Sequence, residues 1–196
     1  MSAVEPRSGR RAANVRQEEI LDAAIDVFGR LGFRQGSVRE VASAVGLTVQ
    51  GVLYYFPTKE QLLMAALERR LDLRRSETEA AQRDRGVVAM MRLHLEAGLA
   101  KPGMMRLFIT LAAEATDPDH PAHHHFLDRY QRVHDEVSAG FAADIETGRA
   151  PGTLDPAEAA VRLIALADGL QLQHLLRPGL DLLTAYDRNT ADLTLQ

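Results

Sequence analysis

The 196-residue sequence contains no cysteine, which excludes disulfide bonds and thiolate metal sites and fits a reducing compartment. It has no run of about 18 apolar residues, so we expect no membrane-spanning helix. No apolar secretory segment follows the first arginines. Catalytic and nucleotide-binding patterns such as G-x-S-x-G, a P-loop and H-E-x-x-H are also missing. We therefore expect a cytoplasmic protein that is not an enzyme and needs no cofactor or metal.

Charge is distributed unevenly along the chain. The net charge is -4, but residues 1–59 contain 8 Lys and Arg against 6 Asp and Glu, and residues 60–196 contain 15 against 21. Local charge decides whether a surface attracts phosphate, so the overall acidity does not exclude a nucleic-acid partner. We expect residues 1–13 to form a flexible basic arm, which either stays in solvent or contacts the minor groove or phosphates.

Apolar residues make up 46% of the chain, enough for a packed core. They recur at helical spacing, and no segment alternates with a period of two, so the sequence predicts an all-α fold. The expected helices cover residues 14–31, 37–45, 48–56, 58–71, 86–99, 104–115, 122–147, 155–176 and 180–190.

The second and third expected helices are short and are joined by the turn Gly46-Leu47-Thr48. Ser37 and Glu40 have the spacing of a capping box at the start of the second helix, and Thr48 is placed to cap the third. In a helix-turn-helix the first of two such helices crosses the DNA backbone and the second enters the major groove. The pattern therefore favours DNA binding, although helix pairs with a glycine turn are also common elsewhere.

The residues around this turn carry a family likeness. Residues 45–63, VGLTVQGVLYYFPTKEQLL, resemble the signature of TetR-family repressors. Upstream, ILDAA at 20–24, LGF at 31–33 and SVREVA at 37–42 match the same pattern. The similarity covers about residues 14–70, and beyond it only the helical layout is similar.

The resemblance implies a division of the chain into two parts. Residues 14–58 would form a three-helix helix-turn-helix domain that binds double-stranded DNA. Residues 59–196 would form a helical domain that binds an effector and dimerises, and the helix starting at residue 58 would link the two parts.

The resemblance also implies contacts with the DNA backbone. Ser37 and Thr48 match cap residues that hold phosphate oxygens, and Lys59 matches a lysine that contacts phosphate. Tyr54 and Tyr55 match an aromatic pair that contacts the backbone. Hydroxyl groups near a helix N-terminus suit a phosphate on physical grounds as well. The alternative for either tyrosine is a core position with a tethered hydroxyl.

Base-reading positions follow from the same match. Val49, Gln50 and Gly51 match residues that face bases, and Arg39 lies where some members use a base-reading arginine. Glutamine pairs bidentately with adenine and arginine with guanine, and a glycine lets the backbone approach closely. Val49 is apolar where a polar residue is frequent, so it can only touch a thymine methyl, and Leu53 replaces a usual tyrosine.

A histidine-rich segment at residues 120–134 suggests an alternative function. Its members are His120, His123, His124, His125 and His134. The three consecutive histidines would point in different directions on a helix, about 100° apart, which argues against one metal site. Pro121 separates His120 from the expected helix. A helical metal-binding protein or enzyme that uses this segment remains the first alternative, and a ligand carrier without DNA binding is the second.

The family likeness places an effector pocket among the helices of the second part. The apolar candidates for its lining are Met91, Leu95, Phe108, Leu111 and Phe126. The polar candidates that would orient a partly apolar ligand are Tyr130, His134, Gln171 and His174. Plain core packing is the alternative for each apolar residue.

The expected helix at 155–176 is apolar around more than one face. A helix buried on one side needs only one apolar stripe, so the surplus predicts a homodimer. In the family the last two helices form this interface. Two-fold symmetry would place the two reading helices on a near-palindromic operator. The sequence thus predicts a DNA-binding transcriptional regulator, a repressor that a small molecule releases from its operator.

Overall fold

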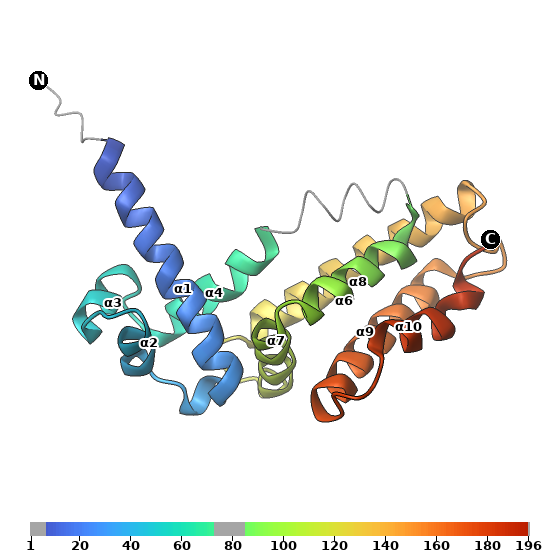
Figure 1. Ribbon diagram of the computed structural model, residues 1–196. Coiled ribbons are helices and arrows are strands. Elements are labelled where there is room, and N and C mark those ends of the chain that lie inside the picture. Colours follow the sequence, from blue (N-terminus) through green and yellow to red (C-terminus); the bar gives the residue numbers. More distant parts are fainter. Residues whose placement is uncertain (1–6, 73–84, 196) are drawn as a thin grey trace, which may run out of the picture. The chain divides into compact units, whose positions relative to one another are not determined.

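The computed structural model describes residues 7–72 and 85–195, and within these ranges the chain forms helices and no strand (Figure 1). This confirms the all-α prediction. The chain divides into two compact units, residues 1–72 and residues 73–196. In the part that the structure describes, no helix has the length and apolar character needed to cross a membrane.

Residues 7–72, the described part of the first unit, form four helices. They are α1 (Arg7–Gln35), α2 (Val38–Ala44), α3 (Val49–Tyr55) and α4 (Lys59–Asp72). Helix α1 packs against α2 and α4, and α2 packs against α3. The buried side chains between them are Ile20, Leu21, Ala24, Val27, Phe28, Phe33, Val41, Ala42, Val52, Phe56, Leu62, Leu63, Ala66 and Leu67. The expected boundary at residue 58 differs from this grouping, because α4 belongs to the first compact unit rather than to the second.

Helix α1 begins earlier than the sequence predicted. It starts at Arg7, so residues 7–13 of the expected flexible arm are helical, and residues 1–6 lie outside the described residues. Arginine and alanine, which fill positions 10–13, are strong helix formers and extend the helix outward. The helix is interrupted at Gly32, whose φ of 73° and ψ of 170° are not helical, which agrees with the predicted stop.

Local hydrogen bonds fix the two short helices. Both bonds of the predicted capping box between Ser37 and Glu40 are present at the start of α2. Gly46 has a φ of 65°, a conformation that a side chain would strain, and the Leu47 N–H donates to Ala42 O at 2.9 Å. Thr48 Oγ1 then accepts the Gly51 N–H at 3.0 Å and starts α3. The predicted helix-turn-helix therefore forms where the sequence placed it.

The second unit contains five α-helices and a short 3-10 turn among its described residues. They are α6 (Val87–Leu99), α7 (Pro102–Glu114), α8 (His123–Glu146), α9 (Pro156–Leu176), α10 (Leu182–Thr190) and η1 (Ala191–Leu193). Helix α9 lies against α8 and α10, and it also contacts α6 and α7 (Figure 1). Asp155 caps α9 by accepting two backbone N–H groups, and Pro156 takes the first helical position.

Buried polar groups hold α6 to its neighbours in this unit. The Asp144 carboxylate of α8 accepts the Val87 N–H at 2.8 Å and an Arg149 Nε–H at 2.8 Å. The hydroxyl of the fully buried Tyr186, from α10, donates to Val88 O at 2.8 Å. The bonds from Val87 to Asp144 and from Tyr186 to Val88 join residues 57 and 98 positions apart in sequence, so they fix how the helices pack rather than where each helix begins.

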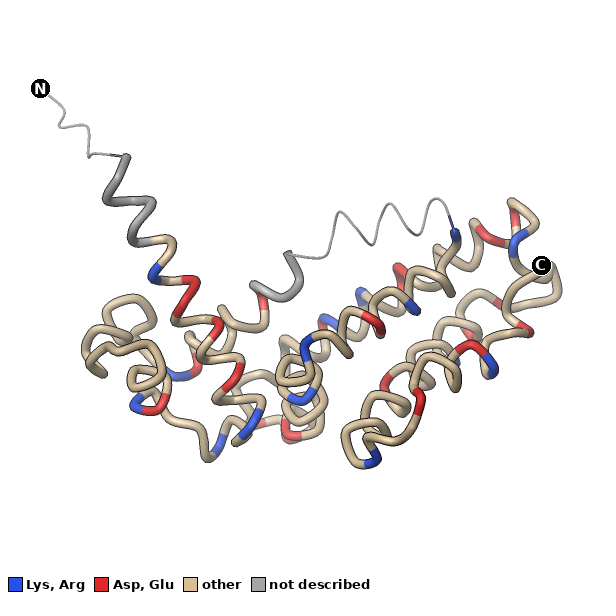
Figure 2. The backbone as a smooth tube through the Cα atoms, in the orientation of Figure 1, with Lys and Arg blue, Asp and Glu red and all other residues tan. Residues whose placement is uncertain are grey.

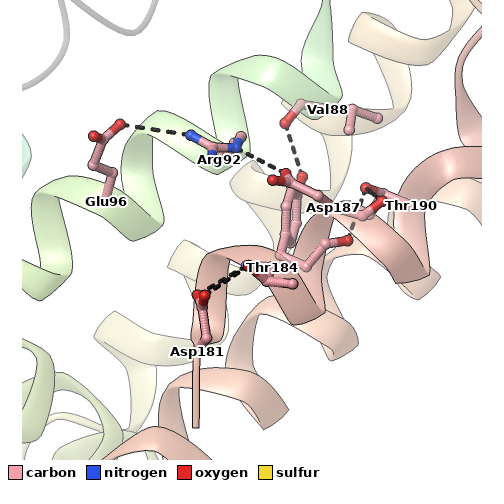
Figure 3. Close-up of polar contacts among 8 residues, drawn as sticks. Val88, Arg92, Glu96, Asp181, Thr184, Asp187 and Thr190 are labelled. Carbon is pink, nitrogen blue, oxygen red and sulfur yellow. Dashed lines mark hydrogen bonds and ion pairs between the residues drawn. The ribbon is translucent and has the colours of Figure 1, made fainter.

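An exposed ion pair adds to the contact between α6 and α10. The Arg92 side chain of α6 reaches Asp187 of α10 at 2.8 Å, and Glu96 lies one turn further along α6 at 3.8 Å (Figure 3). Arg92 has a raised pKa because of the hydrogen bond with Asp187. The pair lies in solvent, so it contributes to alignment more than to stability.

Candidate nucleic-acid interface

Helix α3 divides into a buried and an exposed face. Val52 is fully buried and Phe56, which follows the helix, is nearly so. Gln50 is exposed, and Tyr54, one turn later, is 83% exposed. Residues four apart share a helix face, so these two side chains define a surface directed away from the core. An isolated helix of this length is unstable, and burial of the opposite face therefore holds it.

The exposed face of the two short helices carries little charge. Helix α3 has no acidic or basic residue, and Figure 2 shows its backbone without a red or blue segment. Helix α2 contributes Arg39 and Glu40. Arg39 is exposed and has no hydrogen-bond or ion-pair partner among the side chains that the structure describes, which are those of residues 14–68 and 85–195. Its guanidinium is thus available to a ligand such as a base edge or phosphate.

The two cap hydroxyls predicted to hold phosphates differ in what they can still donate. Ser37 Oγ donates its proton to Glu40 Oε2 at 2.9 Å, so a phosphate would have to replace this carboxylate. Thr48 Oγ1 only accepts a bond, from Gly51 N, and keeps its proton to donate. The geometry therefore favours Thr48 over Ser37 as a phosphate contact.

The two tyrosines of α3 lie in different surroundings. Tyr54 is 83% exposed, which excludes the core position considered as its alternative. Tyr55 is half-buried, and the two rings meet edge to face with centroids 5.3 Å apart. The half-buried ring thereby packs against the exposed one.

Lys59 has intramolecular partners that the sequence did not predict. Its Nζ lies 4.3 Å from the centroid of the Phe33 ring and 3.5 Å from Arg34 O. A cation over an aromatic face is attracted by the ring quadrupole. The lysine thus connects the start of α4 to the end of α1, and the predicted phosphate contact would share the ammonium group with these partners.

The structure divides the predicted effector-lining residues between two clusters. Met91 and Leu95 belong to the main core of the second unit, which agrees with core packing, the alternative to lining a pocket. Phe108 and Phe126 form a buried pair with ring centroids 5.2 Å apart. Leu111, one turn from Phe108 on α7, is fully buried.

Each polar candidate for effector binding has a partner within the unit. Tyr130 donates its hydroxyl to Asp168 Oδ2 at 2.7 Å, and burial with this carboxylate raises the pKa of the tyrosine. The buried Gln171 donates to Ala167 O of its own helix. The two remaining candidates, His134 and His174, lie near Asp135 and Leu180 O respectively.

Sequence reasoning missed Arg129. Its guanidinium carbon lies 4.5 Å from the centroid of the Phe108 ring, and burial lowers its pKa. It has no hydrogen bond or ion pair with any residue in the described part of the chain. The available signal was its position on α8, three residues after the buried Phe126 and therefore on the face that packs.

The histidine-rich segment is part of the connection between α7 and α8. His120 is buried, accepts the Ala122 N–H through Nδ1, and has Nε2 3.6 Å from Glu114. His123 Nδ1 lies 2.9 Å from Ala115 O. Among the described residues, no group of three or more His, Asp or Glu side chains has the arrangement of a metal site.

Helices α2 and α3 are joined by a tight turn, and α3 has an exposed face. This geometry, in a helical fold, is that of helix-turn-helix DNA-binding proteins. Comparisons with known proteins narrow the class. A family profile described as bacterial regulatory proteins of the tetR family matches residues 20–66. A second, described as the C-terminal part of BetI-type transcriptional repressors, matches residues 83–187. The chain belongs to the TetR family of bacterial transcriptional regulators.

The curated relative RutR matches only part of this chain. The HTH-type transcriptional regulator RutR of Escherichia coli is 34% identical over 102 residues, which are 50% of this chain and 48% of RutR. The chain thus spans about half the length of this curated relative.

Solved structures share the fold over nearly the whole chain. A TetR transcriptional regulator of Chloroflexus aurantiacus has a TM-score of 0.78 at 18% identity, over 95% of this chain and 100% of that protein. A protein of Saccharomonospora viridis in complex with choline has a TM-score of 0.76 at 21% identity, over 92% and 98% of the two chains.

Proposed function

We propose that this TetR-family protein is a homodimeric, cytoplasmic repressor that binds a near-palindromic operator and is released from it by a small molecule. The observation that carries the proposal is the face of α3, where Gln50 and Tyr54 project into solvent, together with the exposed Arg39 of α2. Exposed polar side chains of this kind support a role as base and backbone contacts in a major groove.

The proposed dimer rests on an apolar stripe along α9. Val161 is 58% exposed, Leu172 46% and Leu176 74%. Ala165 and Gly169 lie on the same side of the helix, and they are small enough for close approach of a second helix. Apolar side chains in such a row are costly in water and stabilising when a second copy covers them.

The proposed effector site lies in the second unit, where Tyr130, Asp168 and Gln171 bring polar groups next to buried apolar side chains. The protein of the same fold in complex with choline supports a small molecule as effector. In this chain the face of Phe108 already holds the guanidinium of Arg129, so a cationic ligand would compete with that group. A partly apolar ligand without positive charge fits these residues better.

Titration of the purified full chain against labelled DNA from upstream of its own coding region tests the proposal. We expect sequence-preferring binding that resists scrambled competitor and weakens as salt rises, because phosphate contacts release counterions. Equal binding to operator and scrambled DNA, also after a random-sequence selection, would contradict it and favour a ligand carrier without DNA binding.

The dimer can be tested independently by measuring molar mass with light scattering. Leu176→Glu places a charge in the apolar stripe and should shift the mass from dimer to monomer. Gln173→Glu introduces the same charge at an exposed position of the same helix and should leave the mass unchanged. A monomeric wild-type protein would contradict the proposed interface.

A further inference from the structure

The chemistry of α3 restricts which bases this protein can read. The helix has the sequence VQGVLYY, with no arginine or lysine to bind guanine bidentately and no carboxylate to accept from cytosine N4. Its exposed and half-exposed side chains are the amide of Gln50, the phenols of Tyr54 and Tyr55, and the apolar groups of Val49 and Leu53. Of these, Val49 and Gln50 lie in the first turn, which leads into the groove.

Each of the two residues in the first turn of α3 has a preferred partner in the major groove. An amide binds adenine N6 and N7 as donor and acceptor together. Valine methyl groups contact the C5-methyl of thymine. Val49 and Gln50 are consecutive, and Thr48 holds both in the first turn by accepting the Gly51 N–H at 3.0 Å. Both preferences therefore fall on adjacent A·T pairs.

The remaining base-reading group comes from α2. Arg39 is exposed and has no hydrogen-bond or ion-pair partner in the described ranges, and it is the one cationic residue of α2 and α3. The neighbouring Glu40 is bound to the Ser37 N–H at 2.8 Å and to the Ser37 hydroxyl at 2.9 Å. A free guanidinium in this position pairs with guanine O6 and N7.

Building on the operator binding proposed above, we propose that each operator half-site contains an A·T step beneath α3 and one guanine contacted from α2. In this step a thymine methyl contacts Val49, and Gln50 binds an adenine. Arg39 binds the guanine. Tyr54 adds affinity through the backbone and no base preference.

Selection of duplexes from a random library by the full chain, followed by sequencing, tests this reading. The enriched half-sites should contain adjacent A·T pairs and one guanine at fixed spacing. With Gln50→Ala the preference for adenine at one position should fall about ten- to a hundredfold, and with Arg39→Ala the same should happen at the guanine alone. Gln131→Ala, which removes an exposed amide from α8, should leave the selected sequence unchanged.

A change in the DNA alone tests Val49 without a protein variant. Replacing the selected thymine by deoxyuridine removes its methyl group and should weaken binding about three- to fivefold. Val49→Ser should bind both duplexes equally.

Two failures are distinguishable. Half-sites with G·C pairs at the positions that respond to Gln50→Ala, or no response to deoxyuridine, would overturn this inference while operator binding stands. No enriched sequence at any salt concentration would overturn the proposed function itself.

Discussion

Replacing Asp144 by alanine should destabilise the second unit by about 2–4 kcal/mol. The carboxylate is buried and accepts the Val87 N–H and the Arg149 Nε–H, both at 2.8 Å. A buried N–H left without a partner costs about 1–3 kcal/mol. Arg149 is 36% exposed, so water replaces part of its lost ion pair, and we assign this loss about 1 kcal/mol.

Gly86 offers a second way to break the same contact. A Cβ atom on this residue would lie 2.6 Å from Asp144 Oδ2, and its φ of 86° strains any side chain. Gly86→Ala should therefore displace the carboxylate and cost about as much as Asp144→Ala. Because both substitutions remove one interaction, the double variant should be less destabilised than the sum of the two single variants.

Urea unfolding followed by circular dichroism measures these free energies of unfolding. Asp128→Ala is the matched control, since it removes an exposed carboxylate from the same helix and should change stability by less than about 0.5 kcal/mol. If Asp144→Ala costs no more than this control, or if the two single effects add fully, the carboxylate does not stabilise the start of α6 as argued.

Three further predictions concern single contacts. Gly51→Ala should leave stability unchanged or raise it by up to about 1 kcal/mol, because the added Cβ would lie 3.4 Å from the nearest atom. Its DNA affinity should fall at least about tenfold, because the Cβ would keep the backbone away from the DNA. Equal affinity would exclude such a close approach. Tyr186→Phe loses the bond to Val88 O and should cost about 1 kcal/mol in urea unfolding, and a neutral effect would contradict that bond. The hydrogen bonds from Arg162 lower the pKa of Asp192 below its usual 3.8, so its stabilisation is present above that pH and lost as the pH falls below it. The free energy of unfolding of Asp192→Asn should therefore depend less on pH in the acid range than that of wild type. Identical pH dependence would show that the ion pair between Arg162 and Asp192 does not contribute to stability.

Signals within a few residues explain what the sequence predicted of the fold. The caps Ser37, Thr48 and Asp155 each bond to backbone groups two or three residues away, so residue type and spacing suffice to place them. Gln50, which the family resemblance implied would face bases, is exposed. The start of α1 was misplaced, because a charged segment without apolar periodicity can still extend a helix that is already nucleated.

Long-range contacts explain what the sequence did not reveal of the fold and of the candidate site. Asp144 and Val87 are 57 residues apart, and nothing in the local sequence joins them. The partners of Lys59 on α1 depend on how α4 packs. Arg129 over Phe108 requires the contact of two helices that the sequence predicts only separately. The contacts of the site with DNA and effector stay predictions.

The link made by Lys59 has a mechanical consequence. Lys59, the first residue of α4, contacts the Phe33 ring and the Arg34 carbonyl at the end of α1. The fully buried Leu62 and Leu63 follow within about one turn. We therefore expect the start of α4 and the two short helices to move together as one rigid body. In the proposed dimer, a torque on α4 changes the spacing between two undeformed recognition helices. Induction would then lower affinity for the palindrome while each half-site is still read with the same sequence preference.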